Sequence, residues 1–286
     1  MTQKPRVPPA NEHSPNARSA VGRSPESECV SFDLRLRIGH EQIRIRADIP
    51  RETVSLSEFV PIVHSLTDAV MAAAARGAKR EQRLISCGPE CGACCRQLVP
   101  LGEAEAVYLK GVLDALSEDR RVRILERFRV ALQELQDSGL LAELQSEDRL
   151  HGHDKRKKVG LRYFRLGIPC PFLEEESCSI HRHRPLACRE YVVTSDPLHC
   201  ANLETGRVVT LELPRRPSAL FYRFGDGAGL APARWMALPL ALEWIQSDAG
   251  EAGRRTFGAP ELFEHFVQQF TGVEGEDNGS HGTDQR

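Results

Sequence analysis

The stretch Cys87-Gly-Pro-Glu-Cys91-Gly-Ala-Cys94-Cys95 places four cysteines within nine residues of the chain. Eight of the nine cysteines lie between positions 87 and 200, because four more follow at Cys170, Cys178, Cys188 and Cys200. Thiols gathered in this way either pair as disulfides or bind a soft metal as thiolates. The redox state of the compartment decides between these two outcomes.

The composition is that of an ordinary soluble protein. Of its 286 residues, 41% are hydrophobic and 27% are charged, and a net charge of −2 creates no overall field that would attract nucleic acid or an anionic membrane. The sequence contains neither an apolar segment of signal-peptide type nor a run of about 18 apolar residues. We therefore expect a cytoplasmic protein with no membrane or nucleic-acid partner, and the sequence names no protein partner. In a reducing cytoplasm, clustered cysteines favour metal binding over disulfides.

Regular patterns on both sides of the cysteines predict the secondary structure. Residues 30–49 alternate between apolar and polar side chains around Gly39-His40-Glu41-Gln42, which predicts a β-hairpin. Ser55 and Glu58 have capping-box spacing, which predicts a helix from there to about residue 83. Apolar spacing predicts further helices over 103–116, 119–144 (with a break near Gly139), 239–247 and 260–270. The polar and basic residues 151–160 predict a loop, and the Pro- and Cys-rich residues 168–205 predict an irregular segment with short helical turns.

These patterns predict a mainly α fold with a small N-terminal β-hairpin (α+β) and an irregular, Cys-rich metal-binding core. We expect one cysteine-cluster domain over residues 29–271, with the metal-binding core at 87–200. Residues 1–28 and 272–286 are poor in apolar groups that could offset the entropy of ordering, so both are expected to be disordered tails. Cys29, at the edge of the first tail, is expected to be an incidental thiol.

The cysteine spacing limits how the thiolates could share an ion. Cys91-Gly-Ala-Cys94 forms a tight turn in which two thiolates can converge on one metal, and Gly92 permits a close backbone approach. Cys94 and Cys95 are adjacent, so we expect their side chains to diverge, giving either two sites with a common wall or one ligand and one reactive thiol. Cys170, Cys178 and Cys188 are spaced too widely for a zinc ribbon and fit a site closed across the fold. Two four-thiolate sites would use all eight cysteines, and one [4Fe–4S] cluster would use four.

A buried four-thiolate site carries negative charge that needs compensation. Arg96, Arg184 and Arg189 lie beside or near cysteines in the sequence, and we assign them this role, Arg184 and Arg189 foremost. His181 and His183 could serve as spare ligands, although surface or hydrogen-bonded histidines are favoured because eight thiolates are already present.

The run Cys91-Gly-Ala-Cys94-Cys95-Arg96, followed by Cys170-Pro-Phe-Leu, Cys178-Ser-Ile and Arg184-Pro-x2-Cys188-Arg189, resembles the YkgJ-type cysteine-cluster family. The resemblance implies a zinc- or iron-chelating domain of a predicted Fe–S-cluster protein or oxidoreductase. A flagellin lysine methylase has a similar cysteine pattern, which keeps a methylase-like role open. The chain departs from many relatives in having His181 in place of Tyr and three residues between Cys87 and Cys91.

Three hypotheses follow. The first is an Fe–S protein with a redox or cluster-assisted catalytic role, in which Cys87, Cys91, Cys94, Cys95, Cys170, Cys178, Cys188 and Cys200 supply the ligands. The second is a non-catalytic zinc-binding module whose metal closes the fold while another surface binds a partner. Metal delivery or storage is the third and weakest, because delivery sites are usually exposed. The sequence identifies no catalytic residue and no substrate.

Overall fold

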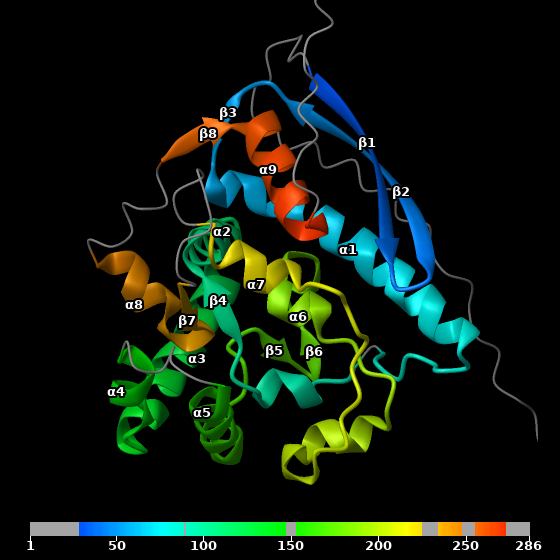
Figure 1. The fold of residues 1–286 in the computed structure, drawn as a ribbon. Coiled ribbons are helices and arrows are strands. Elements are labelled where there is room, and N and C mark those ends of the chain that lie inside the picture. The colour runs from blue at the N-terminus through cyan, green and yellow to red at the C-terminus, as the bar shows by residue number, and fades with distance from the viewer. Residues whose placement is uncertain (1–28, 89, 147–152, 225–233, 248–254, 273–286) are drawn as a thin grey trace, which may run out of the picture.

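An antiparallel hairpin and a long helix open the described part of the computed structural model (Figure 1). The structure describes residues 29–88, 90–146, 153–224, 234–247 and 255–272. The two tails predicted over 1–28 and 272–286 therefore lie outside the described residues, except for Gly272. The described chain is mainly helical with a small N-terminal hairpin, so the predicted fold class is confirmed.

The predicted hairpin consists of β1 (Cys29–Ile38) and β2 (Glu41–Pro50). Gly39 has a φ of 58°, a left-handed conformation that glycine adopts without a steric penalty, and this permits the tight turn. The second strand begins at Glu41, earlier than the apolar pattern indicated, and Leu36 pairs with Ile43 across the ladder. Alternate side chains of both strands are buried, which places one face of the hairpin on the helices below it.

Helix α1 (Leu56–Arg80) follows the short strand β3 (Thr53–Ser55). The predicted capping box is confirmed: the Glu58 amide donates to Ser55 Oγ at 3.2 Å, and the Ser55 amide donates to Glu58 Oε2 at 2.8 Å. Phe59, Val60 and Val70 are fully buried on the helix face that meets the hairpin and the C-terminal helix. The helix then delivers the chain to the first cysteines.

Three helices form the next layer. They are α2 (Glu103–Asp114), α3 (Glu118–Asp137) and α4 (Leu140–Gln145). Gly139, with a φ of 69°, separates α3 from α4, as its position in the sequence predicted.

The prediction of a loop over residues 151–160 is wrong, because residues His153–Leu166 form helix α5. Val159 and Tyr163, one turn apart, are 2% exposed each and pack against Leu140 and Leu144 of α4. The remaining positions are mostly charged, so only a narrow apolar stripe marked this segment as a helix. Burial of that stripe against α4 stabilises the helix in a sequence dominated by Lys and Arg.

The later cysteines lie in a segment of short elements, as predicted. These elements are β5 (Leu173–Glu174), β6 (Ser177–Cys178), η3 (His181–His183), α6 (Leu186–Glu190), η4 (Pro197–Ala201) and η5 (Leu203–Thr205). In the earlier cysteine segment, Cys94 and Cys95 lie in the short turn η1 (Ala93–Arg96). Without long helices or strands, this region depends on side-chain and loop contacts to hold its shape.

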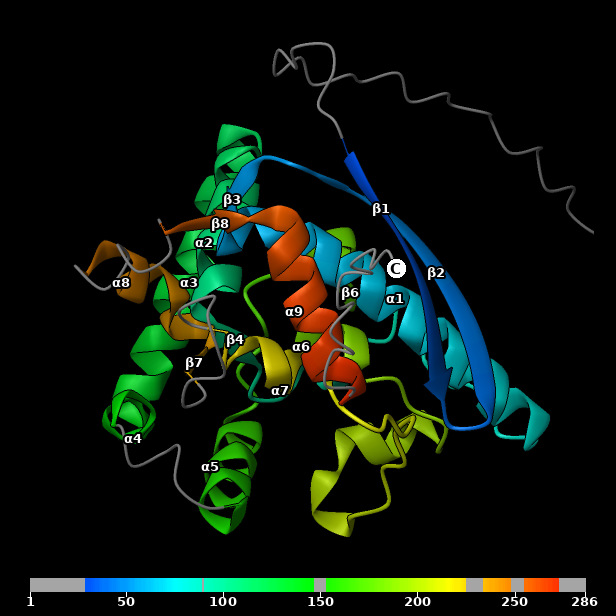
Figure 2. The same ribbon diagram turned by 45° about the horizontal axis from the view of Figure 1, so that its top comes forward.

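The C-terminal elements return to the N-terminal half (Figure 2). They are α7 (Pro217–Phe221), β7 (Trp235–Ala237), η6 (Leu238–Leu240), α8 (Ala241–Gln246), β8 (Thr256–Gly258) and α9 (Ala259–Thr271). Strand β8 pairs with β3, and β7 pairs with β4 (Pro100–Gly102). The helices predicted over 239–247 and 260–270 are confirmed as η6 with α8 and as α9.

Two neighbouring hydrophobic clusters position the cysteine segments. One joins the hairpin, α1, α7 and α9, and the other joins α2, α3, Phe172, Ile180 and Met236. Tyr108 packs against both clusters, and Cys170 and Cys178 pack against the second. Within the described ranges, no helix has both the length and the apolarity needed to cross a bilayer.

Candidate metal centre

The two cysteine segments, far apart in the sequence, meet in the fold. The Cys170 amide donates to the Cys95 carbonyl at 2.7 Å, and η1 contacts η4. The start of the first segment is fixed as well, because the Ser86 amide donates to the Val193 carbonyl at 2.9 Å. These contacts bring three stretches of the cysteine-rich region together: residues 86–96, the start of the second segment at Cys170, and residues 193–201.

Gly92 allows this close approach. A Cβ atom at this position would lie 2.5 Å from Glu176 Oε2 and 2.9 Å from Leu173 Cδ1, so the turn between β5 and β6 leaves no room for a side chain. Arg96 holds the same contact together: its guanidinium donates to both carboxylate oxygens of Glu176, at 2.9 and 2.6 Å, and to the Gly92 carbonyl at 3.0 Å. The charge of Arg96 is thus paired with Glu176, which gives this arginine a role in closing the loop.

The eight clustered thiols influence one another electrostatically. Burial raises the pKa of five of them and the Cys94 charge raises it further; they are Cys87, Cys170, Cys178, Cys188 and Cys200. The Cys91 charge acts in the same direction on Cys87 and Cys200. The charge of Cys94 therefore acts on thiols from both cysteine segments.

The thiols of Cys94 and Cys95 interact with each other, although we expected the two side chains to diverge. They lie on consecutive residues of η1, and each shifts the pKa of the other. The Cys95 thiol donates to Cys94, which lowers the pKa of Cys94 and raises that of Cys95. The doublet therefore loses its first proton more readily than two isolated buried thiols would.

Comparison with family models matches residues 86–206 to CxxCxxCC, described as "Putative zinc- or iron-chelating domain". This segment is similar to the CxxCxxCC family. The matched range contains all eight clustered cysteines, so the resemblance inferred from the motifs is confirmed at the level of this domain. No curated protein and no solved structure matched the chain.

The CxxCxxCC domain offers its sulfur atoms the hydrogen bonds that thiolates require. The Val193 amide donates to Cys87 Sγ at 3.2 Å. The amides of Phe172 and Ile180 donate to the thiols of Cys170 and Cys178, each two residues earlier in the chain, and these bonds lower the pKa of both thiols against the larger effect of burial. Amide bonds to sulfur stabilise thiolate ligands and tune a bound metal.

Arg184 lies at the edge of the thiol group. Its positive charge lowers the pKa of Cys87, Cys94 and Cys178 against the opposing effect of burial on each. Its Nε atom is buried and has no hydrogen-bond partner among the described residues. A buried guanidinium N–H without an acceptor in the described part of the chain fits a site whose occupant brings negative charge. The residues present therefore fit a thiolate-bound zinc ion or Fe–S cluster.

Arg189 has different partners. Its side chain, 7% exposed, donates to both carboxylate oxygens of Asp68 on α1 at 2.7 Å and to the Arg184 carbonyl at 3.2 Å. It also donates to the Arg182 carbonyl. These contacts tie the segment that carries Cys188 to α1, and the predicted compensation of metal charge by Arg189 stays a prediction. Asp68 is an exposed residue of α1 that belongs to no sequence motif, so it was not identified from the sequence.

The two histidines of η3 are exposed and hydrogen-bonded, which is the arrangement that we favoured. His183 Nδ1 lies 2.6 Å from Tyr108 Oη, and His181 Nε2 contacts the Arg184 guanidinium. Cys29 lies at the exposed start of β1.

Thiol protonation opposes metal binding until a metal displaces the protons. Burial is the main cause that raises the pKa of Cys170 to about 12 and that of Cys200 to about 11, and the pKa of Cys188 lies well above its usual range for the same reason. Among the described residues, no three Cys, His, Asp or Glu side chains are already arranged around one ion position. Metal binding by thiolates is therefore coupled to the loss of thiol protons.

Proposed function

We propose that the CxxCxxCC domain of this protein holds an Fe–S cluster, in first place a [4Fe–4S] cluster, through thiolates drawn from both cysteine segments in a reducing cytoplasm. The observation that carries this proposal is the hydrogen bond of 2.7 Å between the Cys170 amide and the Cys95 carbonyl, which joins the two cysteine segments. The donors gathered there are sulfur atoms, and soft sulfur donors select iron–sulfur clusters or zinc over hard cations.

Different residues of this chain would supply the ligands, the hydrogen bonds to sulfur and the compensating charge of such a site. The eight clustered cysteines supply the candidate ligands, and the amides of Phe172, Ile180 and Val193 stabilise thiolates. Arg184 compensates part of the negative charge. A bound cluster supplies one-electron transfer, which supports a role as an oxidoreductase or as a cluster-assisted enzyme.

A zinc-binding module without catalytic activity is the second candidate. The short elements around the cysteines favour it, because a region built from 3₁₀ turns and two-residue strands gains most from a metal that joins its parts. Structural zinc contributes on the order of 10 kcal/mol to folding in small domains that depend on it.

Purification without oxygen separates the two candidates. The Fe–S proposal expects a brown protein with broad visible absorbance, acid-labile sulfide and iron in elemental analysis. A colourless protein with stoichiometric zinc would replace it with the zinc module. Protein that contains neither metal, or whose clustered cysteines are paired as disulfides, contradicts both.

Single substitutions then test the doublet. Cys94→Ser is expected to remove most of the bound metal, because the Cys94 thiol loses its proton more readily than the Cys95 thiol, and Cys95→Ser is expected to remove less. Cys29→Ser is the matched control, since this cysteine lies on the exposed start of β1, and it should retain the full metal content. Full retention of metal in both doublet variants would show that neither cysteine is a ligand.

A further inference from the structure

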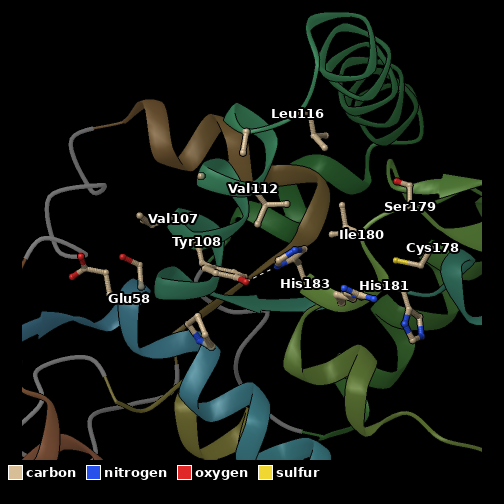
Figure 3. A pocket seen from close by; sticks show the side chains of 15 residues that line it. Glu58, Val107, Tyr108, Val112, Leu116, Cys178, Ser179, Ile180, His181 and His183 are labelled. Atoms are coloured by element: carbon tan, nitrogen blue, oxygen red, sulfur yellow. Dashed lines mark hydrogen bonds between the residues drawn. The ribbon is translucent and has the colours of Figure 1, made fainter. Parts of the chain in front are cut away.

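A pocket of about 1000 Å³ lies between the start of α1, helix α2 and residues 178–183 (Figure 3). Its volume is at the upper end of the range that small-molecule sites occupy in proteins. Figure 3 shows Glu58 and Cys178 at opposite ends of the pocket, with the Tyr108–His183 pair between them. One end of the pocket therefore borders the thiol group, and the other end opens beside the first turn of α1.

Most of the wall is apolar. Helix α2 contributes Val107 and Val112, Leu116 follows just after its end, and Ile180 faces them from the cysteine-rich segment. An apolar wall of this extent stabilises a ligand with a hydrocarbon body, because each buried CH₂ group contributes about 0.8 kcal/mol. Polar groups lie at two places in the wall, around η3 and at the first turn of α1, where Ser57 and Glu58 line the pocket.

The polar side presents hydrogen-bond donors. Tyr108 Oη and His183 Nδ1 are 2.6 Å apart, so this bond orients the His183 ring and leaves its Nε2 atom for another partner. Ser179 Oγ, on the same wall, is buried and has no hydrogen-bond partner among the described residues.

Two charged side chains line the pocket, Glu58 and Arg182, and they differ in whether they already have partners within the described part of the chain. The Glu58 carboxylate accepts hydrogen bonds from the Ser55 amide and hydroxyl, both at 2.8 Å, and is thereby engaged in the cap of α1. The Arg182 guanidinium makes no ion pair with the described part of the chain, and it lies close enough to His183 to lower the pKa of that ring, after burial and Arg189. On the η3 side of the pocket wall, away from Glu58, the charge is therefore positive.

We propose that this pocket binds an organic carboxylate with an apolar body, whose carboxylate pairs with Arg182 and whose hydrocarbon lies along Val112, Leu116 and Ile180. A guanidinium and a carboxylate form a planar, two-point contact that gives orientation as well as affinity. The proposal does not depend on a bound metal. If the metal centre exists as proposed, the ligand lies beside it, at the Cys178 end of the pocket.

Three probes of matched shape test the charge preference on the full chain, by isothermal titration calorimetry. They are phenylbutyrate, phenylbutanol and phenylbutylamine, which share the apolar body and differ in the charge of the end group. Phenylbutyrate is expected to bind about tenfold more tightly than the alcohol, a factor that corresponds to one charge-assisted contact. Tighter binding of the amine, or equal binding of all three probes, would overturn the proposal.

Two variants locate the contact. Arg182→Gln is expected to lose the preference for phenylbutyrate while its affinity for phenylbutanol stays unchanged, and Val112→Trp, which fills the pocket, is expected to abolish binding of both probes. Arg123→Gln, an exposed substitution on α3 at a residue that does not line the pocket, is the matched control and should leave all affinities unchanged. Unaltered phenylbutyrate affinity in Arg182→Gln or in Val112→Trp would place the ligand elsewhere.

Metal content measured on the same samples keeps this proposal separate from the proposed function. Arg182→Gln should retain the metal content of the unaltered protein, and chelator-treated protein should still prefer phenylbutyrate. If freshly purified protein contains no metal but prefers phenylbutyrate, the pocket is sustained and the metal centre is contradicted. If it contains metal but shows no preference for phenylbutyrate, the metal centre is sustained and the pocket proposal is contradicted.

Discussion

Arg184 is the residue whose charge the proposed centre needs most. Its buried Nε lacks an acceptor among the described residues, and its charge acts on thiols from both cysteine segments. We predict that Arg184→Gln lowers metal affinity by about tenfold, the lower end of the effect of residues that support metal ligands, and that Arg184→Lys recovers part of the loss. Competition with a chromophoric chelator measures the metal affinity of each variant. Equal affinities in the Gln variant and the unaltered protein would remove Arg184 from the site.

Gly92 is the residue whose missing side chain lets the two cysteine segments touch. A Cβ atom there would meet the backbone of Glu176 at 3.1 Å as well as two side chains. We predict that Gly92→Ala lowers the free energy of unfolding by about 1–3 kcal/mol, the usual cost of overpacking, and also lowers metal content.

Urea unfolding with metal analysis checks this prediction. Gly160→Ala is the control, since a Cβ atom on Gly160 meets nothing within 4 Å and alanine favours the helix α5 that contains it. A stability loss of the same size in both variants would contradict the packing explanation.

Helix α1 and the segment that carries Cys188 are joined by Arg189, which connects elements that no local pattern relates. We predict that Arg189→Met lowers the free energy of unfolding by about 3 kcal/mol, because the carbonyls of Arg182 and Arg184 lose their donor and Asp68 loses its partner. Asp68→Asn should cost only about 1 kcal/mol, since the Asp68 side chain is 56% exposed and water replaces the lost contact.

Urea unfolding of the two variants measures this difference. Equal losses in both would show that the ion pair, and not the carbonyl contacts, connects the two elements. Amide exchange over residues 182–190 is expected to rise in Arg189→Met before it rises in α1, because the short helix α6 depends on this arginine more than the long helix does.

The pH dependence of the whole molecule includes a contribution from a group buried between α1 and α2. Burial and the charge of Arg189 lower the pKa of His64 to about 3, from 6.5 in the unfolded chain. Below pH 6.5 the unfolded chain therefore binds a proton that the folded protein does not bind. The free energy of unfolding falls as the pH falls from 6.5 towards 3, by about 1.4 kcal/mol per pH unit at most.

Glu105 acts in the opposite direction, because burial raises its pKa to about 7, so its contribution to stability is lost as the pH rises from 4.5 through 7. A comparison of variants isolates His64. His64→Gln is expected to show a weaker loss of stability between pH 6.5 and pH 5 than the unaltered protein in urea unfolding. Parallel curves for the two proteins would show that His64 does not control this range.

Several features of this protein follow from its sequence because they depend on neighbouring residues. The hairpin of residues 29–50 follows from a period of two, α1 from Ser55 and Glu58, and the break at Gly139 from the backbone freedom of glycine. The eight clustered cysteines identified the CxxCxxCC domain for the same reason, since their spacing is a local property of the chain. Helix α5 was missed because two buried residues, Val159 and Tyr163, form too weak a stripe among lysines and arginines.

Tertiary structure decided what depends on residues far apart in the chain. The pairing of β3 with β8 and of β4 with β7, the contact of Cys170 with Cys95, and the reach of Arg189 to Asp68 all join distant segments. The cysteine pattern by itself determined which atoms could bind a metal. The packing of α2 against the cysteine-rich segment determined what surrounds them, a thiol group beside an apolar pocket, because burial and charge at any point are set by all the elements that meet there.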